Sequence, residues 1–143
     1  EQAETIGALV SAGIPVMGHV GLRPQTIHQM GGYKIHRDAD KLLADAQAIQ
    51  DAGAFAVVLE CVPSHIAARI TEQLTIPTIG IGAGPECDGQ VLVAHDLLGL
   101  TSGRVPRFVR QYANLKQVIE DAVSEYCRDV SDGTFPGPDQ TLV

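Results

Sequence analysis

The residues best suited to acid–base chemistry stand at the ends of apolar, strand-like segments. Glu60 directly follows the five apolar residues 55–59, and His19 closes the apolar segment 14–19, next to Gly18. A carboxylate at the end of a buried strand loses solvation, which raises its pKa toward the range of a general base. Glu60 is therefore the candidate catalytic residue, and the alternative is that it caps a helix or pairs with an arginine. His19 is a candidate ligand contact, and the alternative is a structural hydrogen bond to a neighbouring loop.

The segment Gly80-Ile-Gly-Ala-Gly84 is the most glycine-rich part of the chain. It is not a GxGxxG motif, it lacks the lysine of a phosphate-binding loop, and it runs into Pro85 instead of opening a helix. We expect a sharp turn that lines a pocket with backbone amides. This makes Gly82 and Gly84 candidate substrate-binding residues.

The remaining reactive side chains favour structural roles. No histidine stands at a sequence spacing from Cys61 that would indicate a Cys–His catalytic pair. We therefore expect an inert buried thiol. The other histidines share no helical or strand spacing, which argues against a histidine metal site. They are His28, His36, His65 and His95.

Helical and strand-like segments alternate along the chain. Helices are expected at residues 2–11, 38–51, 64–74 and 116–128, and apolar strands at 14–19, 55–59 and 76–81. Apolar strands separated by helices are typical of a parallel sheet buried on both faces, with functional loops at the carboxyl ends of the strands.

The length decides between two such architectures. A complete (β/α)8 barrel needs about 200 residues or more, and this chain has 143. The fold class is therefore α/β, either a small open sheet or about half of a barrel. Unprotected sheet edges favour the half-barrel, with residues 1–143 as a single domain.

Composition excludes several classes of function. The net charge is −7, and aromatic residues make up only 4% of the chain. Acidic residues are in excess and the sequence has no cluster of Lys and Arg, so we expect no nucleic-acid partner. The apolar runs are too short for a membrane span. The three cysteines show no CxxC spacing, which indicates unpaired thiols in a reducing compartment such as the cytoplasm.

Four segments together resemble a known family, the ketopantoate hydroxymethyltransferases, in the C-terminal half of its members. They occur in the family's order and extend over most of the chain. The segments are Gly18-His-Val-Gly-Leu-Arg-Pro-Gln25, Gly31-Gly-Tyr-Lys34, Leu59-Glu-Cys-Val-Pro63 and Ile76-Pro-Thr-Ile-Gly-Ile-Gly-Ala-Gly84.

The resemblance implies a fold, a reaction and roles for residues. The fold would be a TIM (β/α)8 barrel of the phosphoenolpyruvate/pyruvate type, with this chain an incomplete barrel lacking its N-terminal half. The reaction would transfer a hydroxymethyl group from 5,10-methylenetetrahydrofolate to 3-methyl-2-oxobutanoate, giving 2-dehydropantoate for pantothenate biosynthesis. Glu60 would be the proton acceptor, and His19 would lie beside the substrate.

The resemblance also implies a metal and an assembly. Mg²⁺ would hold the keto acid, and its ligands are expected in the N-terminal half, so no metal ligand is assigned here. Members form large homo-oligomers, and a decamer is the expectation. Relatives usually have a longer loop where this sequence has residues 34–38; if about four residues are truly deleted there, a flap over the folate site would be shortened.

The sequence is also compatible with two other functions. One is a carbon–carbon lyase of the same barrel superfamily. The other is a non-catalytic α/β domain in which residues 80–84 bind an anion.

Overall fold

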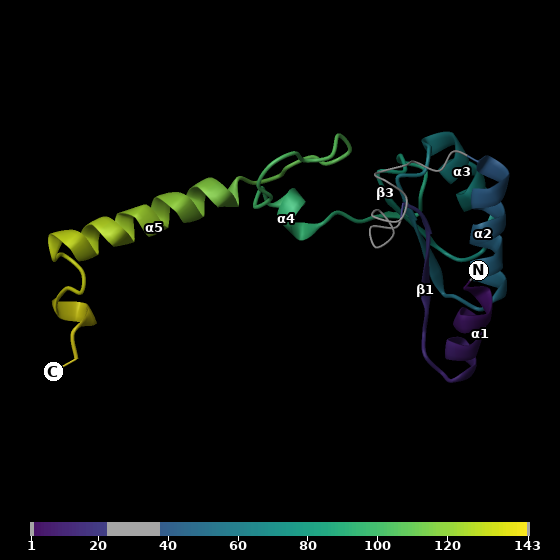
Figure 1. The fold of residues 1–143 in the computed structure, drawn as a ribbon, viewed down its shortest axis with the longest axis horizontal. Coiled ribbons are helices and arrows are strands. Elements are labelled where there is room, and N and C mark those ends of the chain that lie inside the picture. Colours follow the sequence, from purple (N-terminus) through teal and green to yellow (C-terminus); the bar gives the residue numbers. More distant parts are fainter. Residues whose placement is uncertain (1, 23–37, 143) are drawn as a thin grey trace. The chain divides into compact units, whose positions relative to one another are not determined.

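Within the part of the chain that the structure describes, a parallel sheet of four strands, in the order β1-β2-β3-β4, organises the first of two units (Figure 1). In this computed structural model, residues 2–22 and 38–142 are described. The units are Glu1–Val91 and Leu92–Val143. The expectation of a single domain stays a prediction. In the first unit the strands are β1 (Met17–Gly21), β2 (Ala56–Glu60), β3 (Thr78–Ile81) and β4 (Gly89–Gln90), and the helices are α1 (Ala3–Ser11), α2 (Ala39–Asp51) and α3 (Ser64–Gln73).

The expected parallel sheet is confirmed, and its register brings the strand ends together. Gly21 of β1 pairs with Glu60 of β2, which in turn pairs with Ile81 of β3. β1 begins later than the segment 14–19 suggested. The reason is local: the N–H of Ile14 donates back to the carbonyl of Leu9 at the end of α1, and the proline that follows has no N–H.

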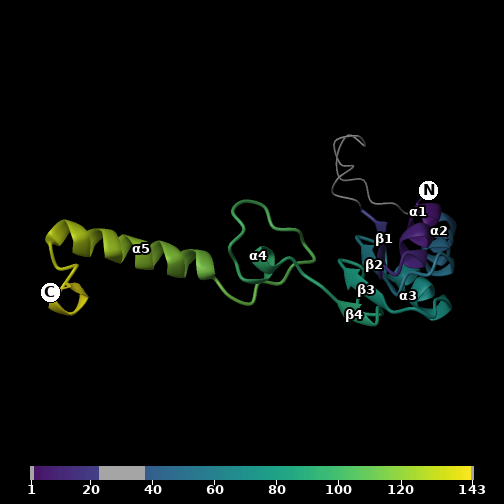
Figure 2. The same ribbon diagram turned by 90° about the horizontal axis from the view of Figure 1, so that it is seen from below.

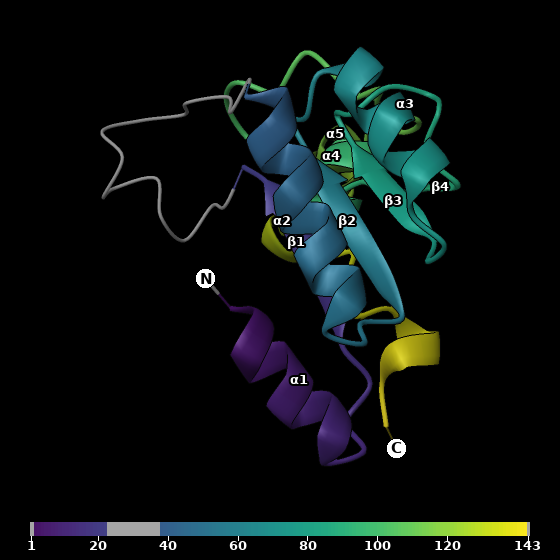
Figure 3. The same cartoon turned by 90° about the vertical axis from the view of Figure 1, so that its right-hand side faces the viewer.

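Helices α2 and α3 pack on one face of this sheet (Figure 3). Because strand side chains alternate, this face receives Val20, Val57 and Leu59, while His19 and Glu60 belong to the other. The core of the unit combines these strand residues with apolar positions of the two helices: Leu42, Ala46, Ile66, Ala67 and Ile70. Burial on both faces was expected, but within the described residues of this unit Met17 on the second face remains exposed.

The helix starts follow from their capping residues. Asp38 accepts a hydrogen bond from the N–H of Lys41 and caps α2 at the position expected from the sequence. α3 begins at Ser64, as the sequence predicts, and Pro63 is the residue that precedes the helix. The carbonyl of Pro63 accepts from both Ile66 and Ala67, so Ser64 is already helical.

The second unit is helical, and Figure 2 shows it in green and yellow. It contains α4 (Ala94–Leu97), α5 (Leu115–Asp132) and a short 3-10 helix (Pro138–Gln140). α5 extends beyond the expected residues 116–128 and ends at Gly133, whose left-handed conformation closes the helix. Among the described residues, no helix combines the length and the apolarity that crossing a membrane requires.

Candidate active site

Glu60 is the last residue of β2, and its side chain is largely buried. Only 16% of that side chain is exposed. Burial raises the pKa of the Glu60 carboxyl, and nearby His19 opposes this effect to a smaller extent. The expected position at a strand end is therefore confirmed, and its environment favours a group that can take up a proton.

His19 lies beside Glu60 on the same face of the sheet. It pairs with Val58, two residues before Glu60, and its Nε2 is 3.4 Å from the Glu60 Oε2. The same Nε2 is 2.7 Å from the carbonyl oxygen of Leu22. Because a carbonyl only accepts, Nε2 is the nitrogen that carries the proton. The expectation that His19 closes its strand is wrong, since the pairing with β2 continues to Gly21.

The glycine segment forms a sharp turn next to the end of β2, as expected. Gly82 and Gly84 have φ angles of +64° and +88°, in the left-handed region that glycine adopts without strain. The turn starts just after Ile81, whose carbonyl accepts a hydrogen bond of 2.9 Å from the N–H of Cys61. At Gly84 a Cβ would collide with Ser64 of α3. The turn thus lies on the same rim of the sheet as Glu60, and substrate binding by the two glycines stays a prediction.

Cys61 is a conformational feature that the sequence did not reveal. Its φ is +53°, which is rare for a residue with a side chain. Burial and the neighbouring Glu60 both raise the pKa of its thiol, so the unreactive protonated form is favoured. The thiol is half-buried, not buried as expected. Backbone strain directly after Glu60 is typical of a functional site.

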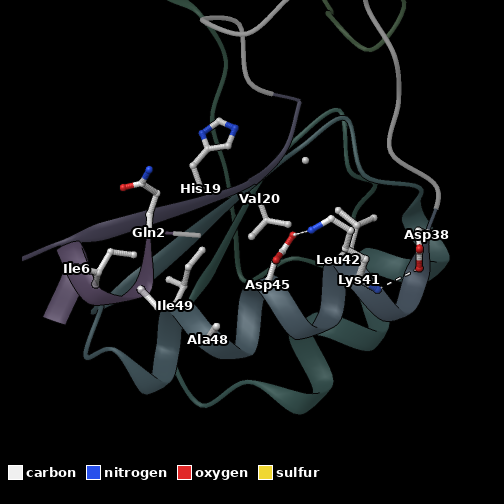
Figure 4. A pocket seen from close by; sticks show the side chains of 12 residues that line it. Gln2, Ile6, His19, Val20, Asp38, Lys41, Leu42, Asp45, Ala48 and Ile49 are labelled. Atoms are coloured by element: carbon white, nitrogen blue, oxygen red, sulfur yellow. Dashed lines mark hydrogen bonds and ion pairs between the residues drawn. The ribbon is translucent and has the colours of Figure 1, made fainter. Parts of the chain in front are cut away.

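A cavity of about 350 Å³ lies between α1, α2 and β1 (Figure 4). Apolar side chains of α2 line it, among them Leu42 and Ile49, together with polar groups such as Asp45. Of the four predicted site residues, only His19 borders this cavity, and Glu60 does not. The cavity therefore adjoins the helix-covered side of β1 and is separate from the carboxyl group of Glu60.

No metal site is formed by the described part of the chain. In residues 2–22 and 38–142, no three His, Cys, Asp or Glu side chains gather as metal ligands. The short loop expected at 34–38 and the motif at 31–34 lie outside the described residues, apart from Asp38.

Comparison with known proteins decides the family. Residues 1–138 match the family model of ketopantoate hydroxymethyltransferase. This chain belongs to the ketopantoate hydroxymethyltransferase family. The resemblance read from the four sequence segments is thereby confirmed. Ketopantoate hydroxymethyltransferases have a TIM-barrel fold, and the parallel α/β sheet described above is part of such a barrel.

Curated relatives agree with this assignment. Three of them are named 3-methyl-2-oxobutanoate hydroxymethyltransferase. The protein of Rhodopirellula baltica is 57% identical over 136 residues, which are 95% of this chain and 51% of the relative. The protein of Syntrophotalea carbinolica is 56% identical over 98% of this chain and 54% of the relative. The protein of Trichlorobacter lovleyi is 58% identical over 94% and 52%. The chain thus spans about half the length of these relatives.

Proposed function

We propose that this chain contributes the general base to an enzyme that transfers a hydroxymethyl group from 5,10-methylenetetrahydrofolate to 3-methyl-2-oxobutanoate. The product would be 2-dehydropantoate, in pantothenate biosynthesis. The observation that carries the proposal is the Glu60 carboxyl, largely buried at a strand end and 3.4 Å from His19. Support also comes from the family and from the names of the curated relatives.

In this reaction the role proposed for this chain is to supply a proton acceptor that is largely buried from solvent. Glu60 takes the proton from C3 of the keto acid, and the electron pair of that C–H bond moves into an enolate. C3 then forms the new carbon–carbon bond to the methylene carbon carried by the folate, while one carbon–nitrogen bond of that methylene breaks and its electron pair stays on nitrogen. A water oxygen replaces the second nitrogen on this carbon to give the hydroxymethyl group. Tetrahydrofolate leaves with its two nitrogens protonated, by the proton from C3 and by one proton of the water. Burial raises the pKa of the Glu60 carboxyl toward neutral pH. Its carboxylate is then a stronger base, which favours this proton transfer.

We propose that the reaction depends on Mg²⁺, whose ligands lie outside this chain. A hard divalent cation polarises a keto oxygen and acidifies the neighbouring C–H bond. The described residues offer no matching set of ligands.

The proposed enzyme is a cytoplasmic homo-oligomer, a decamer by its family resemblance, that takes small-molecule substrates. The negative net charge of −7 is consistent with the absence of a nucleic-acid partner. On α5, Val118, Ile119 and Val123 are each more than half exposed, which favours association with another surface.

Isotope exchange at C3 tests the function directly. A protein that contains this sequence and has the full length of the relatives is incubated with 3-methyl-2-oxobutanoate deuterated at C3, with and without Mg²⁺. We expect enzyme-dependent loss of the C3 deuterium to water, followed by NMR. A lyase acting on another keto acid, or a domain that only binds anions, would leave the label in place, and that result would overturn the proposal.

Replacing His19 with phenylalanine is expected to move the acid limb of the kcat/KM profile to higher pH. The acid limb reports the pKa of the base in the free enzyme. His19 lowers the pKa of the Glu60 carboxyl against the larger effect of burial, so its removal raises that pKa further. The measurement is the pH dependence of kcat/KM, with His65→Phe at an exposed helix position as the matched control. An unchanged or lower acid limb would show that His19 does not act on Glu60.

A further inference from the structure

The main chain of Leu22 is joined by hydrogen bonds to both proposed active-site residues. Its carbonyl oxygen lies 2.7 Å from the Nε2 of His19, which donates to it. Its N–H donates to the carbonyl oxygen of Glu60 at 2.9 Å. The Nε2 of His19 is in turn 3.4 Å from the Glu60 Oε2. These three contacts close a ring that links the histidine side chain, the Leu22 main chain and the glutamate.

Gly21 makes this ring possible because it has no side chain. Its φ is +103°, in the region that favours glycine. A Cβ at this position would collide with the carbonyl oxygen of Glu60, the acceptor of the Leu22 N–H bond, and would lie 2.9 Å from Val62 Cγ2. The first of these obstacles is main chain at the end of a paired strand, so it cannot move aside as a flexible side chain would. Any side chain at position 21 therefore pushes β1 away from Glu60.

We propose that Gly21 and the main chain of Leu22 are positioning residues that hold His19 and Glu60 in their working arrangement. The kinetic part of this inference rests on the proposed function, whereas the geometric part does not. The ring fixes the histidine tautomer, because the nitrogen that faces Glu60 carries a proton, which it donates in the hydrogen bond to the Leu22 carbonyl oxygen. His19 can therefore orient the carboxylate but cannot take a proton at Nε2. Of the two atoms that face each other, only the Glu60 carboxylate oxygen can therefore take up a proton.

The tautomer is measured without any assay of activity. Two-dimensional NMR of the ring nitrogens in the wild-type protein, with the His19 signals assigned by their loss in His19→Gln, distinguishes the two neutral forms. We expect a protonated Nε2 and an unprotonated Nδ1 for His19 at a pH where the ring is neutral. The opposite tautomer, or an averaged mixture of the two, would overturn the inference.

The variant Gly21→Ala tests the positioning role, and Gly13→Ala is its matched control. Gly13 also has a left-handed φ, +80°, but a Cβ there would meet nothing within 4 Å. Both alanines thus carry backbone strain, and only the one at position 21 meets Glu60. We expect Gly21→Ala to lower kcat by about 10²-fold, as for a misplaced catalytic group, with a smaller change in KM. Gly13→Ala is expected to keep wild-type kcat.

The outcomes separate this inference from the proposed function. Equal kcat values for the two alanine variants, with an unchanged His19 spectrum in Gly21→Ala, would refute the positioning role. A protein that shows the Nε2–H tautomer, and loses it in Gly21→Ala, supports the ring even if no C3 exchange is found. In that case the proposed function alone has failed. If Gly21→Ala does not fold, the wild-type tautomer still decides.

Discussion

Glu60→Gln is expected to lower kcat for hydroxymethyl transfer by at least about 10²-fold, the usual contribution of a general base. Glutamine has nearly the same shape, so it fills the space of the carboxyl at the end of β2. It cannot accept the C3 proton at any pH of interest. The same variant should also stop the loss of deuterium from C3, because both measurements depend on breaking that bond.

The stability of Glu60→Gln is expected to change in the opposite direction. Burial raises the pKa of the Glu60 carboxyl in the folded protein above its ordinary value. The folded state then binds the proton more tightly than the unfolded chain, so wild-type stability falls as the pH rises through the interval between the two pKa values. Glutamine has no charge to desolvate. The variant should therefore be more stable than wild type at neutral pH and nearly equal to it below the ordinary carboxyl range.

Urea unfolding at several pH values measures this difference, and Glu72→Gln is the control. Glu72 is an exposed carboxylate in α3. Its replacement should leave both turnover and the pH dependence of stability close to wild type. Near-normal turnover in Glu60→Gln would remove Glu60 from the mechanism. If Glu60→Gln were much less stable than wild type at neutral pH, its lost activity would instead be explained by unfolding.

The general position of Glu60 was predictable because it depends on local sequence. Five apolar residues before it indicate a buried strand, and the end of such a strand is where loops meet in a parallel sheet. The turn at Gly82 and Gly84 was predictable for a similar reason, since only glycine enters the left-handed region freely. Patterns that span fewer than about ten residues therefore identified the rim of the site.

The contact between His19 and Glu60 was not predictable in this way. It depends on the register that sets Gly21 opposite Glu60, two residues far apart in the sequence. A shift of one residue would turn either side chain to the opposite face of the sheet. The left-handed conformation of Cys61 was equally hidden, because the residue type disfavours it and its N–H bonds to Ile81, a residue distant in the sequence. The first acceptor of α3 was hidden as well, because it is the main-chain carbonyl of Pro63 and not a capping side chain.

Asp88→Ala is expected to lower the free energy of unfolding by about 1–3 kcal/mol, the cost of leaving one buried donor unpaired. The Asp88 carboxylate accepts from the N–H of Thr78 at 2.8 Å and from its hydroxyl at 3.1 Å. Thr78 is completely buried at the start of β3. The N–H loses its acceptor when the carboxylate is removed, whereas the hydroxyl can still donate to the Thr71 hydroxyl, whose oxygen is 2.8 Å away.

Two further variants separate the hydrogen bonds from the charge. Asp88→Asn keeps an acceptor oxygen and should recover most of the loss, whereas a purely electrostatic role for Asp88 would make Asn as damaging as Ala. Asp51→Ala, which removes the acceptor of an exposed hydrogen bond from the Gln47 amide, should cost less than about 0.5 kcal/mol. Equal urea midpoints for Asp88→Ala and Asp51→Ala would contradict the prediction. Because β3 leads directly into the turn at Gly82, a weakened start of this strand should also loosen the rim next to Glu60, and Asp88→Asn should restore activity and stability together.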